Sequence, residues 1–151
     1  MRSAKTHSIL LVEDQENDVF FLERAFKQAQ IGNPLFRVRD GEEAIAYLSG
    51  TGAFADRVKS PWPDLMLLDL KMPRKDGFEV ITWVRAQPGP LRRLPIVVLT
   101  SSKEDPDVNR AYELGANTYL MKPVKFDGLV EMMKALNLYW LILAEKPDCA
   151  G

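Results

Sequence analysis

The sequence predicts an α/β protein in which a five-stranded parallel sheet lies between two layers of helices. Short apolar runs alternate with longer segments whose apolar residues recur at the helical period, and this alternation is typical of a three-layer sandwich. Several runs are apolar throughout, as strands buried on both faces of a parallel sheet require. Four runs end in polar residues, and the carboxyl ends of parallel strands meet at one sheet edge, where ligands bind.

The five expected strands follow in chain order. Segments 9–12, 65–68 and 96–99 are continuous apolar runs and predict buried strands. Segment 35–39 alternates apolar and basic residues, which indicates a more peripheral strand. Segment 118–121 precedes a Lys-Pro pair and completes the set.

Helices are expected between the strands, at positions indicated by apolar periodicity and by capping residues. They cover 19–29, the segment after Asp40-Gly41, the segment after Asp76-Gly77, the segment from Asp105-Pro106 to a left-handed cap at Gly115, and 126–141. A long loop is expected at 49–63, where glycine and proline gather and where Trp62 could serve as an anchor. The role of this loop stays open. The expected organisation is an N-terminal tail at 1–7, one domain at 8–143 and a C-terminal tail at 144–151.

Composition narrows the class of protein. The chain has 151 residues, which corresponds to one domain, and its 46% hydrophobic and 27% charged residues are ordinary for a globular protein. A net charge of -1 argues against a nucleic-acid partner. With one cysteine, Cys149, and one histidine, His7, neither an internal disulfide nor a zinc site is expected. No apolar stretch is long enough for a membrane span, and the run after His7 is too short for a signal peptide, so we expect a cytoplasmic protein.

Polar side chains at the strand ends form the candidate site. Glu13 and Asp14 follow the first strand, Asp69 follows the third, Thr100 ends the fourth, and Lys122 follows the fifth. Three carboxylates, a hydroxyl and an ammonium at one edge can hold a divalent cation and a phosphoryl group. Acidic residues at strand ends are often only caps or turn formers, so the combination carries more weight than any single residue.

These residues resemble the receiver domain of bacterial two-component response regulators. The matching segments are 9–14, 67–73 with Asp76-Gly77, 98–101 and 115–123, in family order and spacing. The resemblance covers residues 8–143 and implies a flavodoxin-like (βα)5 fold with strand order 2-1-3-4-5. The loop before Asp69 and the tail at 138–141 are similar to single-domain regulators associated with bacterial phytochrome kinases.

The resemblance implies a role for each site residue. Asp69 would be the phosphoacceptor, with Thr100 and Lys122 contacting phosphoryl oxygens. Mg²⁺ (or Mn²⁺) would be held by Asp14, Asp69 and the backbone carbonyl of Lys71, with Glu13 acting largely through water. The Lys122-Pro123 peptide would be cis. Movement of Thr100 on phosphorylation would draw in Tyr119 as a switch, although a half-buried tyrosine is also an ordinary structural finding.

The implied protein is a stand-alone receiver rather than a conventional enzyme, and no output domain is expected. Its partners would be a histidine kinase or phosphotransfer protein, which could be of the phytochrome type, and an unknown downstream protein. No membrane partner is expected. One face of the apolar tail at 136–143 should pack on the sheet, and the rest is either a lid over the core or a dimer surface. We expect a homodimer through this tail and the face formed by the fourth helix, fifth strand and fifth helix.

Three other functions fit the sequence less well. A degenerate receiver would bind partners without phosphorylation, but the acid, hydroxyl and lysine set is complete. A hydrolase of the haloacid dehalogenase type needs a second acid two residues after its nucleophile, where this chain has Lys71. A nucleotide-binding module needs a glycine-rich loop after the first strand, which is absent from the sequence.

Overall fold

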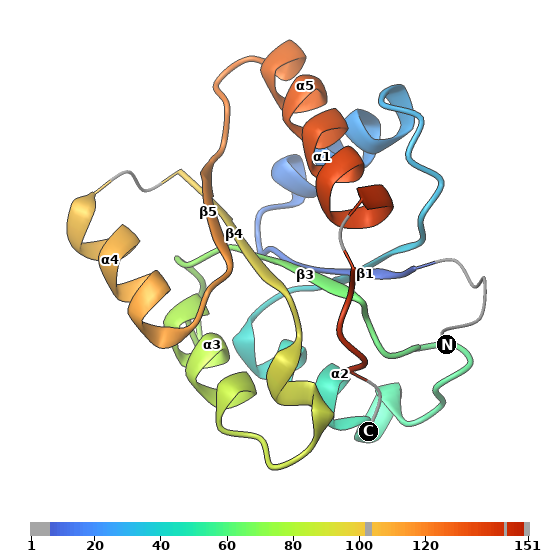
Figure 1. Ribbon diagram of the computed structural model, residues 1–151, viewed down its shortest axis with the longest axis vertical. Coiled ribbons are helices and arrows are strands. Elements are labelled where there is room, and N and C mark those ends of the chain that lie inside the picture. The colour runs from blue at the N-terminus through green and yellow to red at the C-terminus, as the bar shows by residue number, and fades with distance from the viewer. Residues whose placement is uncertain (1–6, 102–103, 144, 150–151) are drawn as a thin grey trace.

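The computed structural model describes residues 7–101, 104–143 and 145–149. Five parallel strands form one sheet in the order β2-β1-β3-β4-β5 (Figure 1). The strands are β1 (Ile9–Val12), β2 (Leu35–Val38), β3 (Leu65–Leu68), β4 (Ile96–Thr100) and β5 (Thr118–Met121). The predicted fold class and strand order are therefore confirmed.

Five α-helices cover the two faces of the sheet. They are α1 (Glu16–Gln28), α2 (Gly41–Ser49), α3 (Gly77–Arg85), α4 (Asp105–Leu114) and α5 (Phe126–Leu136). Helices α1 and α5 pack side by side on one face, and α2, α3 and α4 cover the other (Figure 1). Within the described part of the chain, no helix is long and apolar enough to cross a membrane.

Alternation along each central strand divides the interior into two cores. In β3, Met66 and Leu68 belong to the core beneath α2, α3 and α4, whereas Leu65 and Leu67 belong to the core beneath α1 and α5. Successive side chains of a strand point to opposite faces, so a strand between two helix layers must be apolar at every position. All four β3 side chains are at most 1% exposed.

Local sequence sets the helix ends near the site. Asp40 caps α2 by accepting a hydrogen bond from the Glu43 backbone N–H at 2.8 Å. Asp76 and Glu79 form a capping box at the start of α3. Gly115 ends α4 at a φ of 116°, which favours glycine, as the sequence predicted.

The last helix and the long loop differ in detail from the expectation. The α-helical part of α5 ends at Leu136, and a π-helical segment (Asn137–Leu143) continues it where an α-helix to 141 was expected. The 49–63 loop contains a short 3₁₀ helix (Gly52–Phe54), and a second one (Pro90–Arg93) precedes β4. The Arg57 guanidinium lies 4.0 Å from the Trp62 ring centre and donates to the carbonyls of Leu48 and Ser60, so Trp62 helps to anchor this loop.

The described part of the C-terminal tail returns to the body of the domain. Arg93 donates a hydrogen bond to the Asp148 carbonyl at 2.9 Å. The Cys149 side chain is 4% exposed and belongs to the core beneath α2, α3 and α4. The segment 145–149 therefore packs against the domain rather than extending away from it.

Candidate functional site

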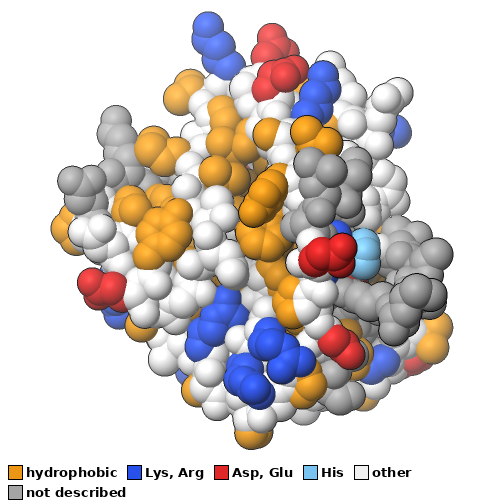
Figure 2. Space-filling model, in the orientation of Figure 1, with side chains coloured by type: hydrophobic (Ala, Val, Ile, Leu, Met, Phe, Trp, Pro, Cys, Tyr) orange, Lys and Arg blue, Asp and Glu red, His pale blue; other side chains and the backbone are white. Residues whose placement is uncertain are grey.

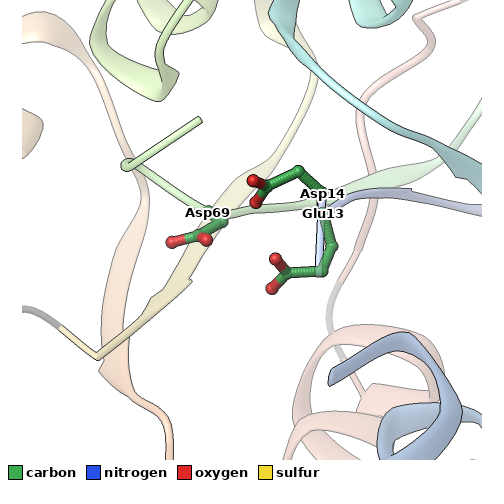
Figure 3. A group of neighbouring side chains, drawn as sticks. All are labelled: Glu13, Asp14 and Asp69. Atoms are coloured by element: carbon green, nitrogen blue, oxygen red, sulfur yellow. The ribbon is translucent and has the colours of Figure 1, made fainter. Parts of the chain in front are cut away.

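The carboxyl ends of β1 and β3 bring the three predicted acids together. Oxygen atoms of Glu13, Asp14 and Asp69 all lie within 4.8 Å of one another (Figure 3). Glu13 and Asp69 are 3% and 7% exposed, and Asp14 is half-buried. Repulsion among three closely spaced carboxylates requires compensating positive charge.

Backbone contacts fix the position of Asp69. Its N–H donates to the Val12 carbonyl at 3.1 Å, which extends the β1-β3 pairing by one residue. Its Oδ1 accepts a hydrogen bond from the Leu70 N–H at 2.8 Å. A Cβ atom on Gly77 would lie 2.5 Å from the Asp69 carbonyl oxygen, so only glycine allows α3 to begin this close to Asp69.

The other two acids are held from the start of α1. Glu13 Oε2 accepts a hydrogen bond from the Gln15 N–H at 3.1 Å, and Asp14 Oδ2 accepts one from Gln15 Nε2 at 3.3 Å. Asp14 Oδ1 is buried and has no hydrogen-bond partner among the described residues. A buried carboxylate oxygen without a donor is unfavourable unless a cation approaches it, so the donor set fits a hard divalent metal ion.

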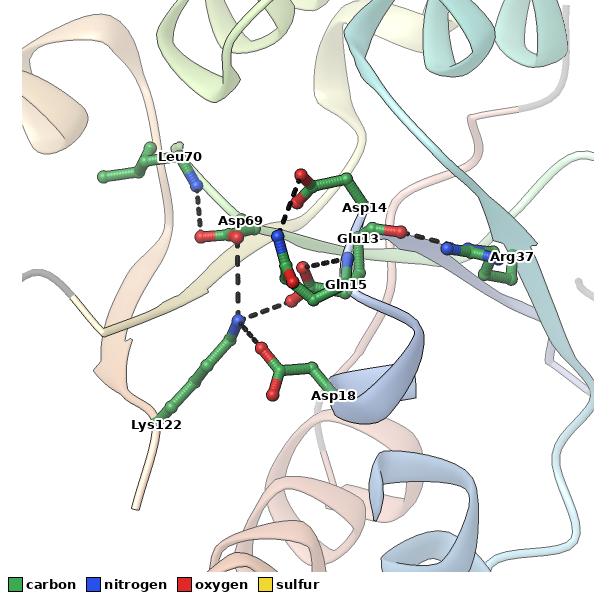
Figure 4. Close-up of polar contacts among 8 residues, drawn as sticks. All are labelled: Glu13, Asp14, Gln15, Asp18, Arg37, Asp69, Leu70 and Lys122. Carbon is green, nitrogen blue, oxygen red and sulfur yellow. Dashed lines mark hydrogen bonds and ion pairs between the residues drawn. The ribbon is translucent and has the colours of Figure 1, made fainter. Parts of the chain in front are cut away.

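The Lys122 side chain extends from the end of β5 and places its positive charge beside Glu13 and Asp69 (Figure 4). Its Nζ donates to Glu13 Oε1 and, at 2.7 Å, to Asp18 Oδ2, and it lies 3.6 Å from Asp69 Oδ2. The Lys122 backbone N–H donates to the Thr100 carbonyl at 2.7 Å, which holds the fourth and fifth strand ends together. The Lys122-Pro123 peptide is trans, so the expected cis bond is wrong. The trans isomer is the more favourable one by about 0.5–1 kcal/mol, and the ammonium reaches the acids without a cis bond.

The pKa values of Glu13 and Lys122 are both raised, for different reasons. Burial raises the pKa of Glu13 to about 7, and neighbouring Asp69 adds to the rise against the lowering effect of Lys122. Burial alone would lower the pKa of Lys122, but hydrogen bonds to Asp18 and Glu13 outweigh it and raise that pKa. The ammonium therefore remains charged at neutral pH.

The remaining predicted residues lie around this cluster. Thr100 is fully buried at the end of β4. Tyr119 is half-buried against the core beneath α2, α3 and α4, and its N–H donates to the Tyr112 hydroxyl at 3.1 Å. Lys71 follows Asp69 by two residues, and its Nζ lies 3.5 Å from Asp107 Oδ2 on α4.

Sequence reasoning missed two features of the site. Asp18, which binds Lys122, lies 104 residues away from it in sequence, and only its place in the first turn of α1 hinted at proximity to Glu13 and Asp14. A cavity of about 250 Å³ opens beside Asp18 and Lys122 between α1 and α5, with apolar walls that include Phe21 and Phe126. No local motif indicates a cavity formed between two helices distant in sequence.

Comparison with known proteins agrees with this geometry. Residues 9–134 match the response regulator receiver domain model. The chain is 40% identical to response regulator Rcp1 of a Synechocystis strain over 133 residues, which is 88% of each protein. The phosphorylated cyanobacterial phytochrome response regulator RcpA superposes with a TM-score of 0.87 at 35% identity, covering 95% of this chain and all of that one. The Mn²⁺-bound form of Rcp1 superposes with a TM-score of 0.83 at 38% identity, covering 94% and 99% of the two chains. The chain therefore belongs to the response regulator receiver domain family of two-component signalling proteins.

Proposed function

We propose that this receiver accepts a phosphoryl group on Asp69 from the phosphohistidine of a histidine kinase or phosphotransfer protein. The observation that carries the proposal is the buried Asp69 carboxylate, which lies among two further acids and 3.6 Å from the Lys122 ammonium. Its relatives support the choice of donor, because the family works in two-component signalling and one structural neighbour is a phosphorylated phytochrome regulator. A phytochrome-type kinase in the cytoplasm is the donor that these relatives favour.

Different residues of the site attack, orient and bind the phosphoryl group in this reaction. An oxygen of the Asp69 carboxylate forms a bond to phosphorus, the P–N bond to the donor imidazole breaks, and its electron pair stays on the imidazole nitrogen. The hydrogen bond from the Leu70 N–H orients the carboxylate for this attack. Lys122 and the Thr100 hydroxyl bind oxygens of the transferred group, whose transfer depends mainly on positioning and charge stabilisation.

The metal ligands in this proposal are Asp14, Asp69 and the Lys71 carbonyl, with Glu13 acting through water. The unpartnered buried oxygen of Asp14 and the close spacing of the three carboxylates support it. The Mn²⁺-bound neighbour Rcp1 supports a divalent ion of this class. A bound Mg²⁺ or Mn²⁺ supplies positive charge that offsets repulsion between the carboxylates and the phosphoryl oxygens.

Signal output in this proposal uses the α4, β5 and α5 side of the molecule. Phosphorylation draws Thr100 toward the phosphoryl group, Tyr119 moves into the space that it leaves, and the packing of α4 shifts. Hydrophobic side chains gather on this side (Figure 2), and Tyr112, Met121, Val124, Leu138 and Tyr139 are more than two-fifths exposed. Such a surface suits a second copy of the chain or a downstream protein.

Intact-protein mass spectrometry after incubation with acetyl phosphate and Mg²⁺ tests the phosphoacceptor role. We expect one phosphoryl-sized addition that disappears with EDTA and in the Asp69→Asn variant. Light scattering on both forms then tests dimerisation. If acetyl phosphate adds no phosphoryl group and beryllofluoride does not bind the wild-type protein, the phosphoacceptor role of Asp69 is refuted.

A further inference from the structure

The Lys122 ammonium is held by more carboxylates than phosphoryl binding requires. It donates hydrogen bonds to Glu13 and to Asp18 Oδ2, whereas its 3.6 Å separation from Asp69 is too long for a hydrogen bond (Figure 4). The ammonium is therefore drawn toward the start of α1 and away from direct bonding with Asp69.

We propose that Asp18 is a positioning residue that holds Lys122 back from Asp69 until a phosphoryl group arrives there. This inference rests on the proposed function of Asp69. Asp18 is the third residue of α1, and in the first turn of that helix its carboxylate faces the end of β5, where Lys122 begins the loop to α5. A carboxylate at this point competes with Asp69 for the same three N–H donors.

Exposure decides which carboxylate releases the ammonium. The Asp18 side chain is 42% exposed, whereas that of Glu13 is 4% exposed. Water can replace Lys122 at Asp18 with little loss, but a buried Glu13 left without its cation would be strongly disfavoured. A phosphoryl group carries more negative charge than one carboxylate. Lys122 therefore keeps Glu13 and exchanges Asp18 for a phosphoryl oxygen.

Removing the charge of Asp18 should make Lys122 more available at Asp69. The Asp18→Asn variant should bind beryllofluoride, a phosphoryl analogue, roughly two- to five-fold more tightly than the wild type, as expected for loss of a competing, partly exposed ion pair. Before the analogue is added, NMR signals of the Lys122 ammonium should exchange with water faster in the variant. A purely structural role for Asp18 would lower stability without tightening binding.

A beryllofluoride titration in Mg²⁺, followed by backbone amide NMR, compares three proteins. The matched control is Glu16→Gln, which removes the same charge from the same helical turn but from a side chain that pairs with Arg37 instead. We expect the control to bind as the wild type does. If the wild type binds but Asp18→Asn binds equally or more weakly, or if the control tightens as much, the role of Asp18 is refuted while the proposed function stands. If the wild type itself fails to bind, the proposed function fails and this inference fails with it.

Discussion

Gly77 begins α3 directly against the backbone of Asp69, and replacing it with alanine sets two opposing effects against each other. Helix propensity alone would favour alanine by about 1 kcal/mol. The new Cβ, however, would lie 2.5 Å from the Asp69 carbonyl oxygen and 2.8 Å from the Leu70 Cα atom. Both are backbone atoms and cannot rotate away, and such overpacking costs about 1–3 kcal/mol or more. We therefore expect net destabilisation of Gly77→Ala by up to about 2 kcal/mol.

Urea denaturation followed by circular dichroism measures this difference. Gly32→Ala is the control, because no atom beyond its own residue and its two chain neighbours lies within 4 Å of the added Cβ, and its φ is not positive. That variant should be unchanged or more stable by up to about 1 kcal/mol. Gly77→Ala should also bind beryllofluoride more weakly, since relief of the clash must shift Asp69 or α3. A Gly77→Ala protein as stable as Gly32→Ala would refute the role assigned to this close approach.

Four further predictions concern other parts of the molecule. Burial raises the pKa of Asp40, but the Glu43 backbone hydrogen bond and Arg74 outweigh it, so the folded-state pKa lies below 3.8. Asp40→Asn should therefore be less stable than the wild type above that pH, and the difference in unfolding free energy should close as pH falls through the folded-state pKa. A difference that does not depend on pH would contradict this. Leu67→Ala, at a fully buried position, should lower the unfolding free energy by about 2–5 kcal/mol in urea titrations, and a loss under 1 kcal/mol would be inconsistent with that burial. At a Mg²⁺ concentration 100 times the wild-type Kd, the ion should stabilise the wild type by about 2.7 kcal/mol in thermal melts. Asp14→Asn should be stabilised less at the same concentration, and equal stabilisation would show that Asp14 is not a ligand. Arg57→Ala should speed proteolysis within the 49–63 loop, and an unchanged cleavage rate would show that Arg57 does not hold it.

Sequence patterns could predict the elements of this fold because the central strands are apolar at every position. The same logic placed Glu13, Asp14 and Asp69 together, since residues that follow parallel strands meet at one edge whatever the helices do. The carboxylate oxygens of these three residues lie within 4.8 Å of one another, which bears out that placement, while the roles of the residues stay predictions.

 Contacts made by long side chains could not be predicted in this way, because they depend on how the helices pack. Asp18 meets Lys122 only because α1 and α5 lie side by side on one face of the sheet.

Two other features were beyond sequence patterns for related reasons. The change from α-helix to π-helix after Leu136 has no marker among the apolar residues that follow it. The clamp formed by Arg57 and Trp62 joins side chains within a glycine- and proline-rich segment, where no periodicity exists to indicate contacts. Prediction was therefore strongest where backbone topology alone determines position, and weakest where side-chain packing does.

The packing of Cys149 gives the protein a built-in chemical reporter. It is the chain's single cysteine, and the residue is 4% exposed within the core beneath α2, α3 and α4. A thiol reagent can modify it only when the tail lifts away, so the labelling rate measures the free energy of that local opening. No engineered probe is needed, and the reaction follows one site. Comparing the labelling rate of Cys149 with and without beryllofluoride would show whether binding at Asp69 changes the stability of the tail at the other end of the sheet.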